Sequence, residues 1–171
     1  MIKIEIVKKE NATVLALLGR ITYAESHKHY ISDKKDLKNF LDEAYSINKT
    51  LHDLNNPQNL FYLIYIEDLP VGYAKLVLNE KHKSITSDNI CRLERIYILN
   101  EFIPLKLGQR LLSFVEEESK TLQLDTIWLS VYIKNTRAIR FYEKNEFKKV
   151  GNLNFMVNDK DYENIVYSKT L

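Results

Sequence analysis

RLERIYI, residues 92–98, decides the fold together with the two segments that follow it. An amphipathic helical pattern covers 107–122, with its leucines on one side. TIWLSVY, residues 126–132, is short, apolar and bounded by polar residues, as a buried strand is. A strand, a helix and a strand in this order predict a βαβ unit, in which the two strands are parallel and the crossover is right-handed.

The rest of the chain adds strands and helices on both sides of this unit. Period-two alternation and β-branched or aromatic runs predict strands, and apolar residues at helical spacing predict helices. Strands are expected over 2–6, 60–66, 71–78, 147–155 and 164–171, and helices from Asn11, from about Asp33 to Asn55, and over 135–145. The segments 60–66 and 71–78 form a hairpin around 67–70. The order predicts an α/β fold, a mixed, mostly antiparallel sheet with helices on both faces and a central parallel strand pair.

Composition excludes several classes of protein. The 171 residues carry 25 Lys and Arg against 23 Asp and Glu, and a dedicated nucleic-acid binder has a larger basic excess. The single cysteine excludes a disulfide framework and a cysteine-cluster zinc site. No run approaches the roughly 20 apolar residues of a membrane span. We therefore expect a single domain over 1–171, cytoplasmic, with no metal and with neither membrane nor nucleic acid as a partner.

The junction between residue 98 and the helix at 107 is the first candidate site. Free N–H groups at a helix N-terminus and the helix dipole favour an anion such as phosphate. Gly108 permits close approach of a ligand, while Lys106 and Arg110 add positive charge. The alternative is an ordinary turn with solvated basic residues. A P-loop or dinucleotide-binding fold has no support, because neither glycine motif is present.

The second candidate site is the helical segment that begins after Asn135. Asn135 is placed to cap this helix, and Ala138 and Tyr142 share one face of it. A positioned tyrosine hydroxyl can act as a general acid. The alternative is that Phe141 and Tyr142 are simply core aromatic residues.

Taken together, these motifs resemble a known family. Leu93-Glu-Arg-Ile-Tyr-Ile98, Leu107-Gly108 and Asn135-x-x-Ala-Ile-x-Phe-Tyr142 stand in the order and spacing of the GNAT superfamily of acetyl-CoA-dependent N-acetyltransferases. The resemblance covers nearly the whole chain. Within this superfamily, the chain most resembles the PaiA-type spermidine/spermine N-acetyltransferases. The segments that carry this narrower resemblance are Thr22-Tyr-x-Glu-Ser, Asp36-Leu-x-x-Phe-Leu-x-x-Ala-Tyr45, Ile127-Trp-Leu129 and Ser168-Lys-Thr-Leu171.

This resemblance implies roles for individual residues. Tyr142 would protonate the departing CoA thiolate, and Glu94 would take the proton of the substrate ammonium. Separately from the resemblance, the carboxylates of Glu25, Asp42 and Glu43 are candidates for attracting a polycation, the alternative being exposed helical carboxylates. We expect Glu25 and Glu94 to bind the amine. Acetyl-CoA is implied as co-substrate, with direct attack by a primary amine in a ternary complex and no metal. The implied cofactor-binding residues are Ile96, Tyr97, Ile98, Ile103, Pro104, Leu105, Lys106, Leu107, Gly108, Gln109, Arg110, Asn135, Ala138, Phe141 and Tyr142.

Two positions depart from the family pattern. The phosphate loop usually reads Gln/Arg-x-x-Gly-x-Gly/Ala, and here these positions are Ile103, Lys106 and Gly108. A lysine adopts positive φ less easily than glycine, so we expect the loop to follow another path. The glycine common before the aromatic residue after the last helix is replaced by Glu146, which predicts an altered helix C-cap.

Three alternatives to a polyamine acetyltransferase stay open from the sequence. A related enzyme would acetylate a protein or peptide amine. A non-catalytic regulatory module would bind CoA without turnover, and the altered phosphate loop motivates this alternative. A structural α/β domain would bind no CoA, which three agreeing motifs disfavour. The partner expected is a small-molecule amine, on a chain that is a monomer or a homodimer.

Overall fold

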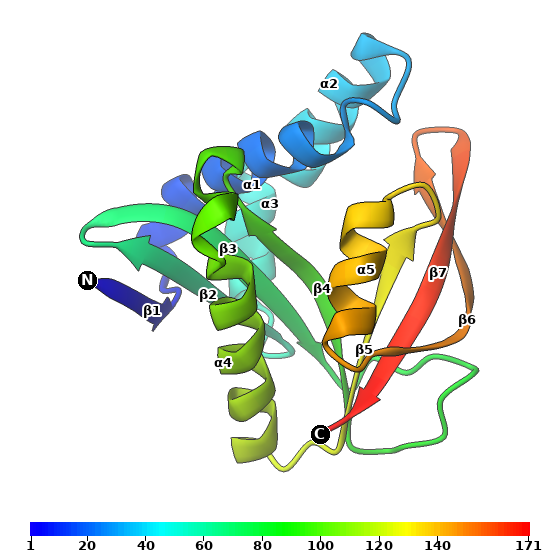
Figure 1. Cartoon of the computed structure of the whole chain (residues 1–171). Helices are drawn as coiled ribbons and strands as arrows, with labels where there is room; N and C mark the ends of the chain where they lie inside the picture. The colour runs from blue at the N-terminus through cyan, green and yellow to red at the C-terminus, as the bar shows by residue number, and fades with distance from the viewer. The chain divides into compact units, whose positions relative to one another are not determined.

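The computed structural model describes residues Met1–Leu171 and contains one seven-stranded sheet with the order β1-β2-β3-β4-β5-β7-β6 (Figure 1). Strands and helices follow the predicted order, except that two helices stand where one was expected over 33–55, and two 3-10 segments are added. The elements are β1 (Ile2–Ile6), η1 (Lys9–Asn11), α1 (Ala12–His27), α2 (Lys34–Ala44), α3 (Ile47–Asn55), β2 (Asn59–Ile66), β3 (Leu69–Leu78), β4 (Ile90–Ile98), η2 (Asn100–Leu105), α4 (Leu107–Thr121), β5 (Thr126–Tyr132), α5 (Thr136–Lys144), β6 (Lys148–Val157) and β7 (Lys160–Thr170).

The chain divides into two compact units, which are described separately. The first comprises Met1–Leu76 and Arg95–Val115, and the second comprises Val77–Glu94 and Glu116–Leu171. The chain passes from one unit to the other within β3, β4 and α4. The single domain expected over 1–171 stays a prediction.

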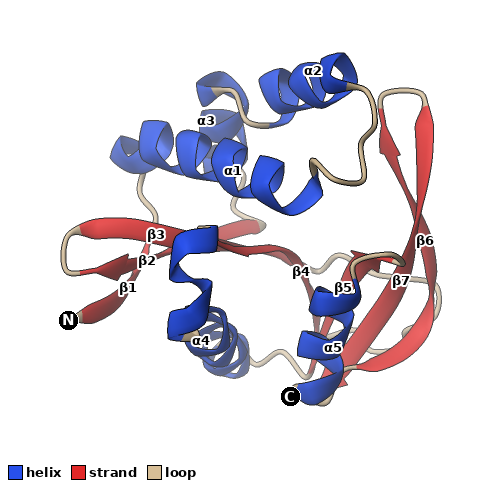
Figure 2. Ribbon diagram, turned by 45° about the horizontal axis from the view of Figure 1, so that its top comes forward, coloured by secondary structure: helices blue, strands red, loops and turns tan.

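In the first unit, helices cover both faces of the β1–β3 part of the sheet. Figure 2 shows α1, α2 and α3 on one face and the first turns of α4 on the other. On the α4 side, the rings of Tyr62 and Phe114 meet edge to face at 5.3 Å. On the other side, α1 contributes Leu15 and Leu18 to a core cluster with Phe61. The predicted hairpin is present, although its turn is shorter than 67–70 because β3 already begins at Leu69.

The prediction of one long helix from Asp33 to Asn55 is wrong, because two helices occupy this stretch. Asp33 caps α2 by accepting hydrogen bonds from the N–H groups of Lys35 and Asp36. The helix ends at Ala44, and the Ser46 hydroxyl then accepts from the Lys49 N–H to cap α3. The two helices continue one apolar pattern, so periodicity alone conceals the break.

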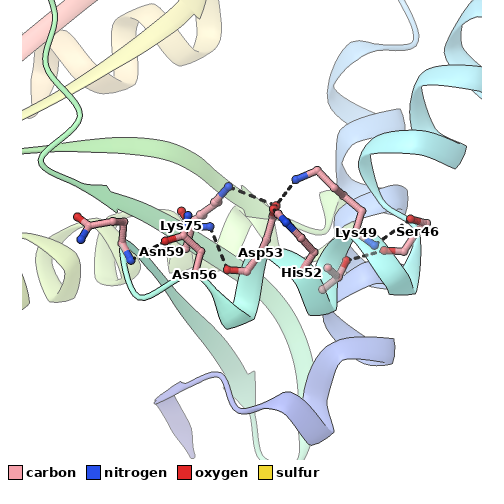
Figure 3. Close-up of polar contacts among 9 residues, drawn as sticks. Ser46, Lys49, His52, Asp53, Asn56, Asn59 and Lys75 are labelled. Atoms are coloured by element: carbon pink, nitrogen blue, oxygen red, sulfur yellow. Dashed lines mark hydrogen bonds and ion pairs between the residues drawn. The ribbon is translucent and has the colours of Figure 1, made fainter.

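A buried ion pair links α3 to β3 (Figure 3). Asp53 and Lys75 are each 5% exposed, and the Lys75 Nζ lies 3.4 Å from the Asp53 Oδ2. Lys49, one turn earlier on α3, contacts the other carboxylate oxygen of Asp53. The Asp53 backbone carbonyl also accepts a hydrogen bond from the Asn59 side chain at 3.0 Å. Both buried charges therefore have partners, as burial requires.

The second unit contains the predicted parallel strand pair. Ile90, Cys91 and Arg92 of β4 pair with residues 126–128 of β5, and β5, β7 and β6 pair antiparallel. Trp128 packs with Ile90 and other apolar residues, and its indole N–H donates to the Glu80 carbonyl at 2.7 Å. The predicted α/β fold class is confirmed.

Gly72 on β3 is required by the close approach of β4 within the first unit. A Cβ built there would lie 2.5 Å from the Tyr97 carbonyl oxygen and would clash with the end of Ile98. Because a backbone atom cannot swing away, we expect Gly72→Ala to lower the free energy of unfolding by about 2 kcal/mol, measured by chemical denaturation. Gly151→Ala is the matched control, since its Cβ would meet mainly the movable Ser84 side chain. Equal costs for the two variants would contradict this explanation.

Candidate active site

The first set of predicted site residues follows β4 in the first unit. The Leu99 N–H donates to the Val71 carbonyl at 2.9 Å, which holds the end of β4 beside β3. The open loop expected next is instead a 3-10 helix over Asn100–Leu105. Lys106 then takes the left-handed conformation, with φ 56° and ψ 27°. Lys106 therefore adopts the positive φ that we expected a lysine to avoid. The prediction that the loop would follow another path for this reason is wrong.

Lys106 also starts α4. Its carbonyl accepts hydrogen bonds from the N–H groups of Gln109 at 3.1 Å and Arg110 at 3.4 Å. Leu107 is fully buried and fixes the first turn against the core, whereas Lys106, Gln109 and Arg110 are exposed. The N–H groups of Leu107 and Gly108, which come before those of Gln109 and Arg110, have no intrahelical acceptor. This turn therefore presents N–H groups, two cations and the small Gly108 to solvent, which fits an anionic ligand.

Among the strand residues Ile96–Ile98, Tyr97 has a side chain that is packed within the first unit. The ring of Tyr97 is held among aromatic residues, edge-on to Tyr23 at 6.3 Å and tilted against Tyr73 at 5.9 Å. Burial raises the pKa of Tyr97 well above its ordinary value. This side chain is therefore committed to packing and is not available to a ligand.

His27 belongs to the same aromatic cluster, and this position was not predicted from the sequence. Its ring stacks on Tyr23 at 4.1 Å and meets Tyr97 edge to face at 6.1 Å. Burial lowers the pKa of His27 to about 4, against a smaller opposing effect of its hydrogen bond to the Tyr23 carbonyl. The imidazole is therefore neutral at pH 7. The aromatic spacing Tyr23-x-x-x-His27 on one helix face was the available signal.

Glu25, predicted to bind the amine, has a partner in the first unit. Its Oε2 accepts a hydrogen bond from the Asn100 N–H at 2.9 Å. The half-buried Glu25 thus ties the end of α1 to the start of η2. This contact gives Glu25 a positioning role, and its role toward substrate stays a prediction.

The second set of predicted site residues lies on α5 in the second unit. The Asn135 Oδ1 accepts a hydrogen bond from the Ala138 N–H at 3.2 Å, so the predicted N-cap is confirmed. Tyr142 is buried, with its ring edge-on to Phe141 at 5.3 Å and to Phe147 at 5.7 Å. Burial raises the pKa of Tyr142 above its ordinary value. The phenol therefore keeps its proton at neutral pH and is available as a donor.

Glu94 and Cys91 are two further ionisable groups on β4 in the second unit. Glu94 is half-buried on β4, next to the buried Leu93. Cys91 is fully buried, and desolvation raises the pKa of its thiol to about 11, so it is a poor nucleophile. No group of three or more His, Cys, Asp or Glu side chains is arranged to hold a metal ion. None of the helices is long and apolar enough to cross a membrane.

Glu146 does not alter the C-cap of α5, contrary to expectation. It adopts φ 68°, the left-handed conformation usual for glycine at this position. The Glu146 N–H donates to the Glu143 carbonyl at 3.1 Å, and the Phe147 N–H donates to the Tyr142 carbonyl at 3.1 Å. These two bonds form a Schellman motif, so the cap is preserved at the cost of local backbone strain.

Removing this strain should stabilise the protein. We expect Glu146→Gly to raise the free energy of unfolding by about 1 kcal/mol, because glycine pays no steric cost at positive φ. Lys144→Gly, two residues earlier inside α5, is the control and should lower it by about 1 kcal/mol. Chemical denaturation of both variants measures the difference. A loss of stability in Glu146→Gly would contradict the strain argument.

Comparison with known proteins agrees with this arrangement. A family profile described as "Acetyltransferase (GNAT) family" matches residues 23–147. A protein named "Uncharacterized N-acetyltransferase in pepI 3'region", from Lactobacillus delbrueckii subsp. lactis, is 24% identical over 170 residues, covering 99% of this chain and 98% of the relative. The PaiA N-acetyltransferase of Thermoplasma acidophilum, solved with coenzyme A, superposes with a TM-score of 0.77 at 21% identity, covering 100% of this chain and 99% of that one.

A second solved structure extends the likeness to another N-acetyltransferase. The ribosomal-protein-S18-alanine N-acetyltransferase of Escherichia coli superposes with a TM-score of 0.68 at 16% identity, covering 99% of this chain and 94% of that one. The fold is therefore that of an acyltransferase. The family match makes the assignment specific, and the chain belongs to the acetyltransferase (GNAT) family. The predicted resemblance and enzyme class are confirmed.

Proposed function

We propose that this chain transfers an acetyl group from acetyl-CoA to a primary amine, by direct attack within a ternary complex. The observation that carries the proposal is the turn between η2 and α4. There, Lys106 adopts positive φ without glycine, and Lys106 and Arg110 lie exposed beside the first N–H groups of α4. A pyrophosphate is the kind of ligand for which such a turn is suited.

The segments 96–98 and 103–110 of the first unit would supply most of the groups that hold acetyl-CoA. The exposed turn over 103–110 would bind the pyrophosphate through backbone N–H groups and the two cations. The backbone of Ile96–Ile98 would pair with the amides of the pantetheine arm, as an added strand does. The parallel pairing of β4 with β5 covers Ile90–Arg92 of β4, so the segment 96–98 lies outside the paired residues. On α5, the Asn135 amide nitrogen would help to position the same arm, because its oxygen caps the helix.

Two side chains of the second unit would move the protons. Bound acetyl-CoA supplies the acetyl group as a thioester. The Glu94 carboxylate would accept a proton from the substrate ammonium, directly or through water, because an alkyl ammonium with a pKa of about 10 is mostly unreactive at pH 7. The resulting amine nitrogen forms a bond to the acetyl carbon as the carbon–sulfur bond breaks. The Tyr142 phenol would then donate its proton to the departing sulfur, and the second proton, which the acetylated nitrogen loses, would restore the phenol directly or through water.

The acceptor that we propose is a polyamine such as spermidine or spermine. The narrower sequence resemblance to PaiA-type enzymes supports this choice, and Glu25 and Glu94 would attract the cationic acceptor. Asp42, another candidate for this attraction, pairs with Arg20 at 2.6 Å and with Lys38 at 2.5 Å. Its charge is therefore already compensated, and we leave it out of the acceptor site.

Calorimetry followed by a thiol-release assay tests this function. Acetyl-CoA is titrated into the full chain, and spermidine, spermine, amino acids and peptides with free N-termini are then offered as acceptors. We expect binding and thiol release, fastest with a polyamine. Binding without thiol release from any acceptor would indicate a regulatory module, and absence of binding would refute the function. Preference for peptides would refute the polyamine acceptor alone.

The phosphate turn has a separate test. We expect Lys106→Glu to weaken acetyl-CoA binding about tenfold, because it places a negative charge beside the pyrophosphate, and the effect should shrink at high salt. Lys35→Glu, an equally exposed position on α2, is the matched control and should leave the affinity unchanged. Equal affinity in the Lys106 and Lys35 variants would remove this turn from the binding site.

A further inference from the structure

The outward face of α1 is unusually apolar. Val14, Leu17 and Ile21 are 40%, 58% and 41% exposed, whereas Leu15 and Leu18 on the opposite face are buried. An exposed helix of a globular protein normally carries polar residues on its outer face. The outer face of α1 therefore has no partner within the chain, although it has the composition of a buried one.

This face has the spacing of a helix-packing seam. Its residues alternate in steps of four and three, which is the a/d pattern of helices that pack side by side. At 100° per residue, the four of these residues that lie within α1 fall within about 80° of arc, in one straight stripe along the helix. We call these residues the α1 stripe: Glu10, Val14, Leu17, Ile21, Ala24 and Lys28.

The α1 stripe carries opposite charges at its two ends. Glu10, in η1, and Lys28, the C-cap of α1, are both exposed, and neither has an ion-pair partner in the chain. They lie 18 residues apart, or about 27 Å along a helix, so they do not reach each other. An antiparallel copy of the same helix would bring each of them opposite the other.

We propose that the chain forms a homodimer in which the α1 stripe packs antiparallel on the α1 stripe of a second copy. The two-fold axis passes between Leu17 and Ile21. Leu17 then packs against the partner's Ile21, and the bulky Val14 faces the small Ala24 of the partner subunit. At each end, Glu10 meets the partner's Lys28.

The pairing is self-complementary, as a two-fold interface must be. In every facing pair of the proposed register, the two residue numbers have the same sum. One register therefore aligns the apolar residues and pairs the charges at both ends. A partner of different sequence has no reason to match this symmetry. The proposal does not depend on the proposed acetyl transfer.

Sedimentation equilibrium of the full chain tests the dimer. The stripe is small for a stable interface, so we expect dissociation in the micromolar range, visible between about 1 µM and about 1 mM. Leu17→Asp should make the chain monomeric over that range. Met156→Asp, at a similarly exposed apolar residue on β6, should leave the dimer unchanged. Circular dichroism shows that each variant is folded.

Charge reversal tests the register. Glu10→Lys should weaken the dimer roughly three- to tenfold, because two attractive pairs become repulsive. Adding Lys28→Glu should restore the affinity, which only contact between copies explains. A wild-type monomer up to 1 mM, a dimer that survives Leu17→Asp, or a double variant no better than the single one would each overturn the proposal.

Discussion

Replacing Asp53 with asparagine is expected to lower the free energy of unfolding at pH 7 by about 3 kcal/mol. Asparagine has nearly the same size, so packing is kept and only the charge is lost. Lys75, 5% exposed, would then keep its buried ammonium without the carboxylate that lies 3.4 Å away. Lys49, on the same helix, would lose its partner as well. Urea denaturation of the two proteins measures the difference.

The effect should depend on pH. Burial alone would raise the pKa of Asp53, but the hydrogen bond from Lys49 and the charge of Lys75 outweigh it, so the pKa lies below the ordinary value. A carboxyl group with a lowered pKa in the folded state stabilises the fold above its unfolded pKa of about 3.9 and loses that contribution as pH falls further. The difference between wild type and Asp53→Asn should therefore be full at pH 7 and narrow below about pH 4.

Two comparisons make this prediction specific to the buried pair. Asp42→Asn removes an exposed carboxylate that also has two cationic partners, and its effect should be several-fold smaller. Lys75→Met in the Asp53→Asn background should recover most of the loss, since it removes the buried charge that has lost its carboxylate. If Asp53→Asn costs no more than Asp42→Asn, the ion pair does not hold α3 to β3.

Local patterns predicted much of this fold. The βαβ unit could be predicted because strand 92–98, helix 107–122 and strand 126–132 each have a clear period and polar boundaries. The break at Tyr45 and Ser46 was missed because an N-cap serine in the middle of a continuous apolar pattern resembles an ordinary helix position. Whether such a serine caps a new helix or continues the old one depends on which conformation the surrounding packing favours.

The positive φ values of Lys106 and Glu146 could not be predicted from residue type. Each residue disfavours that conformation alone, and the hydrogen bonds around it impose it. The strain of about 1 kcal/mol is small beside the contacts of a helix terminus. Side-chain preference therefore predicts the cost of the turn rather than its shape.

Long-range polar contacts were the least predictable part of the structure. Asp53 and Lys75 are 22 residues apart, and Glu25 is 75 residues from Asn100. Asp, Glu and Lys are mostly exposed, so nothing in their local sequence marks these as buried or half-buried. The candidate acid Tyr142 was easier, since an N-cap, a small residue and a tyrosine at helical spacing are all local signals.

Replacing Tyr142 with phenylalanine is expected to lower the turnover number about 100-fold, with acetyl-CoA affinity changed less than about threefold. Phenylalanine keeps the ring between Phe141 and Phe147 and removes only the hydroxyl. That hydroxyl makes no hydrogen bond within the chain, and burial raises its pKa, so its loss removes a proton donor and no structural contact. Thiol release under saturating acetyl-CoA and amine measures turnover, and calorimetry measures affinity.

Tyr167→Phe is the matched control for Tyr142→Phe. The Tyr167 hydroxyl donates a hydrogen bond to Glu143 of α5 at 3.0 Å, so this variant also removes a phenol beside the same helix. It should keep most of the turnover, because that hydroxyl already has a structural partner. A general acid is needed least when the leaving thiol is already acidic, so a more acidic thioester donor should recover part of the loss in Tyr142→Phe. Equal turnover in wild type and Tyr142→Phe would remove Tyr142 from its role, and equal losses in both variants would assign the effect to the position of α5.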